Sequence, residues 1–182
     1  MILCAQVPLS CPVINALTPP QDRPSLKAVS RLRCIFHVSK TERIHIIHPS
    51  FHDYLSEQCS DQPWSINLEH HNQKLALSCI KLLDKELQEN ICDMTLPYLS
   101  QKVTLPEAIS YACKFWIEHI CLVSDVTDDI VNQIYAFLAK HLLHWMEALM
   151  ILKSHDHTIR WIDNLMGWLR VCPLICAMGA FH

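Results

Sequence analysis

The chain has 182 residues, 51% of them hydrophobic, and a formal net charge of −3, which excludes an intrinsically disordered chain and gives no sign of a polyanionic partner for the whole chain. That length suits one domain of ordinary size or two small ones. The two glycines, Gly167 and Gly179, are too few for a phosphate-cradling loop or a dinucleotide-binding fingerprint.

The first part of the chain predicts short elements in a recognisable order. Ser10 is placed as the N-cap of a brief helix that ends near Leu17. A second helix begins near Ser25, two β-prone runs at 34–38 and 43–47 flank a polar turn, and a closing helix covers 49–56. Helix, helix and hairpin in this order are typical of a winged helix, so we predict a winged-helix-like start.

The rest of the chain predicts four amphipathic helices in an antiparallel bundle or array. Their expected ranges are 68–90, 106–121, 127–153 and 157–170. The sign of the charge changes near residue 57, from +2 over residues 1–57 to −5 over the remainder. We therefore predict an all-α, mainly helical fold with a winged-helix-like segment at 1–57 and a helical domain at 58–182.

Cysteine usage and the first residues favour a cytoplasmic protein. The ten cysteines among 182 residues are a smaller share than the roughly 8–10% found in disulfide-built chains. Several of them, such as Cys79 and Cys113, lie among apolar neighbours. The first 22 residues contain no Lys or Arg, and Pro8 and Pro12 interrupt them, so a signal peptide is not expected. No segment reaches the roughly 20 apolar residues of a membrane span.

Histidines and cysteines offer weak candidates for metal or catalytic chemistry. His141 and His144 share one face of a predicted helix, but zinc needs two further ligands and neither CxxC nor HExxH occurs. Cys172 and Cys176 lack the spacing of a redox or zinc pair, and no GxSxG elbow is present. We expect no metal site, no catalytic residue and no enzyme activity.

A basic face on the helix near Ser25 is the one candidate for nucleic-acid contact. Lys27, Arg31 and Arg33 could neutralise a few phosphates, as the recognition helix of a winged-helix protein does. That helix carries no Asn or Gln to read base edges, so DNA is not the expected partner. The alternatives kept open are a free-standing winged-helix DNA-binding module, which a salt-titrated mobility-shift assay would identify, and a helical protein-interaction module.

Five ordered motifs resemble fungal NACHT-domain proteins of the STAND NTPase class. Residues 46–55 (IIHPSFHDYL) are similar to the family's "hHPSFxDFL", which ends its winged-helix part; animal NOD-like receptors have a related stretch. Further resemblances follow in family order: 8–10 to "PLS", 70–92 to "HxxLALRCLxLM…LxxNIC", 105–119 to "LPxxLxYACRFWxxHL", and 137–147 to "FLxxHLLHWLE". Together they cover about residues 7–170.

The resemblance implies a regulatory and structural role. In that family the histidine that matches His48 lies against the phosphates of the nucleotide held by the NACHT core, which implies a nucleotide-sensing role for His48 that depends on such a core. The family's P-loop segments precede the winged helix, so we expect this chain to be a fragment, a truncated gene product or a part that acts on a NACHT core elsewhere. We expect no cofactor in the chain itself, and ADP or ATP only when it is joined to a NACHT core. The implied partners are that core and downstream repeat or effector domains.

Overall fold

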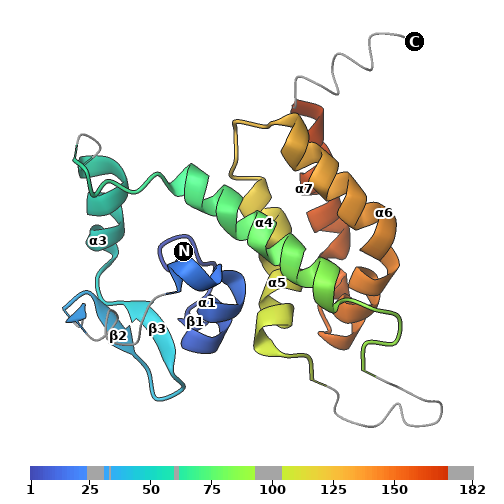
Figure 1. Ribbon diagram of the computed structural model, residues 1–182, viewed down its shortest axis with the longest axis horizontal. Coiled ribbons are helices and arrows are strands. Elements are labelled where there is room, and N and C mark those ends of the chain that lie inside the picture. Colours follow the sequence, from blue (N-terminus) through green and yellow to red (C-terminus); the bar gives the residue numbers. More distant parts are fainter. Residues whose placement is uncertain (24–30, 33, 60–61, 93–103, 172–182) are drawn as a thin grey trace.

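The computed structural model describes residues 1–23, 31–32, 34–59, 62–92 and 104–171, and these residues are mainly helical, as predicted. Figure 1 shows a small sheet and a short helix on one side, and a set of longer helices on the other. Among the described segments, no helix has the length and apolar character required to cross a bilayer.

The N-terminal part contains a three-stranded antiparallel sheet in the order β1-β3-β2. Its elements are β1 (Leu9–Ser10), α1 (Cys11–Leu17), η1 (Pro20–Asp22), β2 (Phe36–Val38), β3 (Arg43–Ile46), α3 (Pro49–Asp53) and η2 (Tyr54–Gln58). The predicted hairpin is confirmed, with His37 opposite His45 in the β2–β3 pair. The closing helix is also present, and it continues from α3 into a π-helical turn at η2.

Two expectations for this part were incomplete. Strand β1 was not predicted, because its two residues carry no periodic signal and become a strand only by pairing with Ile44 and Arg43 of β3. Ser10 does stand at the N-cap position of α1, but its side chain makes no cap hydrogen bond. Most of the second predicted helix, at 24–30, lies outside the described residues, so the winged-helix interpretation stays a prediction.

Four helices follow, and successive ones run in opposite directions (Figure 1). They are α4 (Leu68–Glu86), α5 (Glu107–Ile120), α6 (Asp128–Ile151) and α7 (Thr158–Val171), with η3 (His155–His157) before the last. Asn67 caps α4 by accepting the His70 N–H at 2.9 Å, and Thr127 occupies the same position in α6. The predicted helices are therefore present, with shifts at their ends.

Helix α4 ends four residues earlier than predicted. Leu87 turns into an extended conformation and remains buried. Asn90 adopts a left-handed backbone conformation, which asparagine tolerates better than most residues, and its N–H donates to Glu147 of α6 at 3.1 Å. A tertiary contact thus competes with continuation of the helix, and local periodicity could not reveal it.

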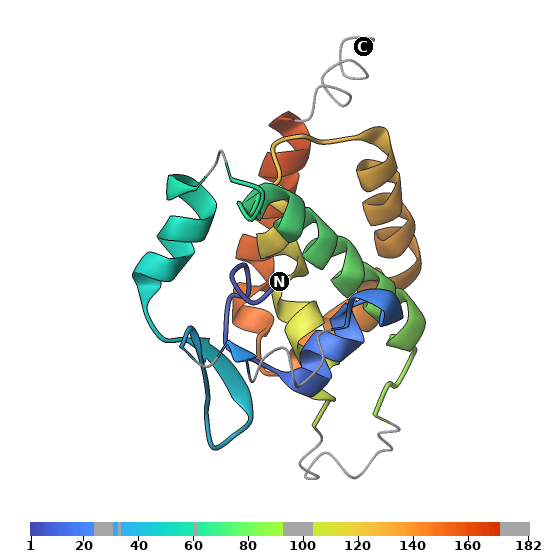
Figure 2. The same ribbon diagram turned by 60° about the vertical axis from the view of Figure 1, so that its left-hand side comes forward.

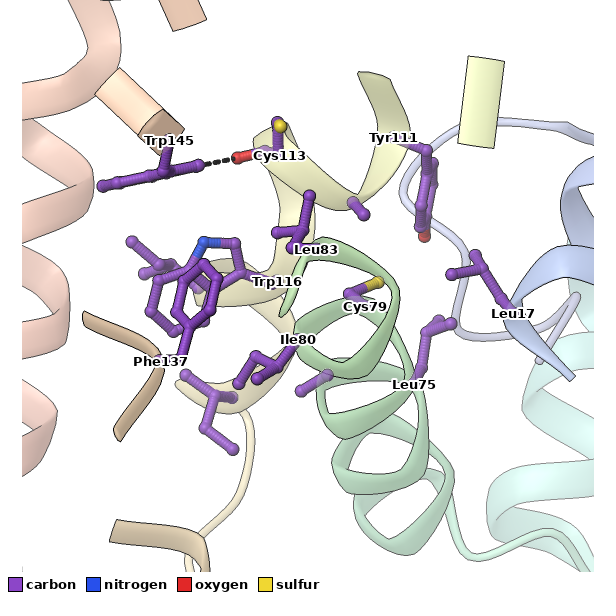
Figure 3. Packing of buried hydrophobic residues seen from close by; sticks show 14 of the residues in the cluster. Leu17, Leu75, Cys79, Ile80, Leu83, Tyr111, Cys113, Trp116, Phe137 and Trp145 are labelled. Atoms are coloured by element: carbon purple, nitrogen blue, oxygen red, sulfur yellow. Dashed lines mark hydrogen bonds between the residues drawn. The ribbon is translucent and has the colours of Figure 1, made fainter. Parts of the chain in front are cut away.

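The core lies between α4, α5 and α6 and is built around aromatic side chains (Figure 3). Trp116 is fully buried and makes edge-to-face contacts with Phe137 and Trp145, at centroid distances of 5.5 and 5.8 Å. The Trp145 indole N–H donates to the carbonyl oxygen of Cys113 at 2.9 Å. Edge-to-face aromatic pairs stabilise the fold in addition to the stability gained by burying the rings. These rings therefore help to hold α5 against α6.

Most residues of the predicted apolar stripes are buried, but α6 departs from the expectation. Leu142, which follows the helical spacing of the apolar stripe with Trp145 and Leu149, is 39% exposed. The polar residue His141 beside it is 3% exposed and stacks on Phe137. The adjacent exposed side chains Leu143 and Met146 show that α6 carries apolar residues over more of its circumference than one neighbour can cover.

The N-terminal part and the long helices share one buried cluster. Leu9, Val13, Ile14 and Leu17 belong to the same cluster as the inward side chains of α4 and α5. In Figure 3, Leu17 and Leu75 point toward one another from α1 and α4. The domain boundary near residue 57 stays a prediction. Helix α1 precedes that position and packs with helices that follow it.

The structure shows free thiols at seven cysteines: Cys4, Cys11, Cys34, Cys59, Cys79, Cys113 and Cys121. Cys79 and Cys113 are fully buried, as expected, whereas Cys121 is only partly buried. Burial raises the pKa of the Cys113 thiol to about 12, because a thiolate loses its hydration there. This thiol is protonated at neutral pH and acts as a small apolar group.

Candidate functional site

His48 lies at the junction between strand β3 and helix α3, where the chain leaves the sheet. It is exposed, and it is the N-cap residue of α3, with Pro49 as the first helical residue. Its Nδ1 accepts the Ser50 N–H at 3.2 Å and lies 2.6 Å from the Ser50 hydroxyl oxygen. The imidazole thus performs the capping that Ser, Asp or Asn usually perform.

These two contacts determine which ring nitrogen of His48 carries the proton. A backbone N–H can only donate, so Nδ1 must be the acceptor and the neutral ring carries its hydrogen on Nε2. The Ser50 hydroxyl donates to the same Nδ1 atom. Nε2 makes no hydrogen bond to any residue in the described part of the chain, so a directed N–H donor faces outward.

The surroundings of His48 suit contact with another body. The neighbouring Ile47 is 54% exposed. Its backbone is fixed, because its N–H donates to the Ile35 carbonyl at 2.9 Å. In Figures 1 and 2, α3 and the β2–β3 hairpin project away from the long helices. A fixed donor beside an exposed apolar side chain on a projecting arm is an arrangement that can dock against a surface carrying an anion.

A polar cluster connects this arm to the helical part. Glu107, in the first turn of α5, forms an ion pair with Arg43 of β3 and accepts the Ser10 hydroxyl at 2.8 Å. Arg43 also donates to the Pro8 carbonyl at 2.9 Å. One carboxylate therefore joins β1, β3 and the start of α5, and it explains why the Ser10 side chain is not available to cap α1.

Glu107→Ala is expected to loosen the arm without unfolding the protein. Both members of the ion pair are partly exposed, so the free energy of unfolding should fall by only about 1 kcal/mol. Amide hydrogen exchange at Ile44 and the rest of β3 should accelerate several-fold, because β3 loses its tie to α5. Glu86→Ala, which removes an exposed pair on α4, serves as control, and unchanged exchange in β3 would contradict the assignment.

The predicted basic face is not assembled in the described part of the chain. Lys27 and Arg33 lie outside the described residues. Arg31 is exposed. This candidate therefore remains a sequence-based prediction.

His141 and His144 form a polar contact rather than a metal site. Their Nδ1 atoms lie 3.1 Å apart, and Nε2 of His141 lies 3.2 Å from Asp84, too poorly aligned for a hydrogen bond. Lys140 donates to the same carboxylate at 3.0 Å and, with His141, holds the pKa of Asp84 below its usual range. No group of three or more potential ligands able to hold a metal ion occurs among the described side chains.

A buried hydrogen-bond chain was missed by the sequence reasoning. The Tyr111 hydroxyl lies 2.7 Å from Nε2 of His119, whose Nδ1 lies 2.9 Å from Oδ1 of Asn72. The Asn72 amide donates onward to the Leu68 carbonyl at 3.0 Å, so Oδ1 is the acceptor and His119 the donor at Nδ1. Burial lowers the pKa of His119 to about 4.

A signal for these buried hydrogen bonds was present in the sequence. Asn72 lies one turn before Leu75, and His119 lies one turn after Trp116, so both occupy apolar stripes. A polar residue on such a stripe must find a partner when buried. The pairing across 47 residues could not be read from spacing alone.

Comparison with known proteins gives one distant relative. The chain is 23% identical over 174 residues to vegetative incompatibility protein HET-E-1 of Podospora anserina, a fungal protein with a NACHT domain and WD repeats. The match covers 80% of this chain but 13% of the relative's length. No family model matches the chain, and no solved structure matches it significantly. The similarity indicates a distant relationship to a NACHT-containing fungal protein.

Proposed function

We propose that this chain is a non-catalytic regulatory segment of a NACHT-type nucleotide-switch protein, coupling the nucleotide state of a NACHT core to downstream modules. The order of the family-like motifs and the distant similarity to HET-E-1 support this proposal. The observation that carries it is the outward N–H donor of His48, held by Ser50 at the junction between β3 and α3.

In this proposal His48 reports the presence of a phosphate. The core holds ADP, and the Nε2–H of His48 donates to one of its phosphate oxygens. A hydrogen bond to an ionised acceptor is about twice as strong as a neutral one, and the ring is already oriented by Ser50 before the nucleotide arrives. His48 thereby favours the closed, ADP-bound arrangement of core and arm.

The arm is built to pass a displacement on to the helices. If the phosphate contact is lost, the arm can move only together with β3, and β3 is tied to α5 through Arg43 and Glu107. Behind that ion pair, Leu9 and Ile44 enter the shared core. A shift at His48 would therefore act on α5 and the helices packed against it.

The test uses a longer protein in which this segment follows a NACHT core loaded with a fluorescent ADP. His48→Ala should accelerate release of the nucleotide by roughly ten-fold or more, the effect of losing one hydrogen bond to a charged group. His52→Ala, on the next turn of α3 and beside Asp53, is the matched control and should release at the wild-type rate. Calorimetry on the isolated chain should show no binding of ATP or ADP.

Two results would overturn the proposal. Equal release rates for the His48 and His52 variants would remove the sensing role. Micromolar binding of ATP by the isolated chain would mean that the nucleotide site lies within it. Ser50→Ala should fall between wild type and His48→Ala, because the ring keeps its donor but loses one of the contacts that orient it.

A further inference from the structure

A groove separate from the His48 arm lies between α1 and α4. Its volume is about 670 Å³, within the range of protein ligand sites. The floor is apolar: Ile2, Phe36 of β2 and Leu77 of α4 keep part of their surface accessible, whereas the lining residues Ile14, Leu17 and Leu75 are nearly inaccessible to solvent. Figures 1 and 2 both show α1 beside α4.

The α4 wall of this groove is basic. His71, Lys74, Ser78 and Lys81 line it at intervals of three and four residues, which places them along one face of the helix. Lys74 and Lys81 are exposed. They are seven residues apart, so their ammonium groups project from positions about 10 Å apart along the helix axis.

The acidic residues of α4 do not neutralise this wall. Glu69 accepts three hydrogen bonds from Ser124 and Asp125, and Asp84 pairs with Lys140 of α6. Neither Lys74 nor Lys81 forms an ion pair with a residue that the structure describes. An apolar floor beside two uncompensated positive charges is complementary to an apolar surface flanked by negative charges.

We propose that the α1–α4 groove binds an amphipathic helix of a protein partner, with its apolar stripe against Ile2, Phe36 and Leu77 and its acidic residues facing Lys74 and Lys81. Helix-in-groove binding of this kind uses apolar anchors at i, i+3, i+4 and i+7 for affinity. The charged rim selects the partner, because a basic helix would be repelled by the same two lysines.

Charge distinguishes this occupant from the alternatives within the chain. Residues 24–30, which lie outside the described part, contain Lys27 and no acidic residue, so they do not complement a basic rim. The charge of the groove therefore favours an acidic amphipathic helix of a protein partner.

The experiment measures fluorescence polarisation of a labelled designed peptide with the full chain. The peptide has leucines at i, i+3, i+4 and i+7 and glutamates on the flanking positions, and a twin peptide replaces every glutamate with lysine. Wild type should bind the glutamate peptide and not the lysine peptide. The double variant Lys74→Glu, Lys81→Glu should lose roughly ten-fold in affinity for the first and gain affinity for the second.

Two further variants separate the groove from general charge. Lys40→Glu with Arg160→Glu makes the same change in net charge at exposed positions outside the groove lining and should leave binding unchanged. Ser78→Trp fills the groove without removing a charge and should abolish binding of the glutamate peptide, with thermal melts confirming that each variant folds.

Four outcomes would overturn the proposal. Wild type could bind neither peptide, or bind both alike. Binding could appear only after Leu26→Asp and Val29→Asp, which would show that the chain's own segment fills the groove. Self-association in sedimentation velocity that Ser78→Trp removes would show that a second copy occupies it.

Discussion

Trp116→Ala is expected to lower the free energy of unfolding by about 3–5 kcal/mol, the range measured for removal of a large buried aromatic ring. Trp116 is fully buried and is in contact with both Phe137 and Trp145, so α5 and α6 cannot close the cavity without moving apart. Since folded domains are stable by only about 5–15 kcal/mol, this variant should be close to unfolding. Urea denaturation followed by circular dichroism measures the change.

Two controls define the cause of that loss. Trp64→Ala removes the same side chain at a position that is 54% exposed, and it should change stability by no more than about 0.5 kcal/mol. Trp116→Phe should cost much less than alanine, because it keeps a ring and removes an indole N–H that has no partner within the described structure. Similar losses for the exposed and buried tryptophans would refute the assigned core.

A pH-dependent loss of stability between pH 6.5 and about 4 is the second large effect expected, and His119 is its source. The folded protein keeps His119 neutral with a pKa of about 4, whereas an unfolded histidine titrates near 6.5. Below pH 6.5 the unfolded chain therefore binds the additional proton, and stability falls as the pH is lowered. The full shift corresponds to about 3 kcal/mol, complete near pH 4.

The variant His119→Gln isolates this contribution. Glutamine cannot titrate, so the difference in unfolding free energy between wild type and variant should shrink as the pH falls from 7 to 4. At pH 7 the variant should be less stable, because Tyr111 and Asn72 lose their shared partner. The exposed His70→Gln should follow the wild-type pH profile. Parallel profiles for wild type and His119→Gln would assign the acid sensitivity to other groups.

The order of the helices could be predicted from periodicity because each long helix buries one stripe. In α5 the predicted residues Ile109, Trp116 and Ile120 are all buried. The hairpin could also be predicted from the sequence, because a polar turn separates two β-prone runs. The position of His48 at a helix start also followed from the local sequence, with Pro49 directly after it.

The geometry that gives His48 its proposed role depended on tertiary and capping contacts. Periodicity assigns no tautomer, and it was the Ser50 N–H that made Nδ1 the acceptor. The tie from Arg43 to Glu107 joins residues 64 positions apart in the chain, which no local pattern encodes. The sequence resemblance named the residue, and the folded chain decided which of its atoms faces outward.

The sequence by itself determined that this protein is mainly helical, because apolar residues at helical spacing must be buried together. It also limited the chemistry, since two glycines cannot build a phosphate loop. Only the tertiary structure decided which polar residues enter the core, as His119 and His141 do, and which charges have no ion-pair partner among the described residues, as on Lys74 and Lys81. The physical reason is that hydrogen bonds and ion pairs join groups distant in the chain, and their partners exist only once the helices have packed.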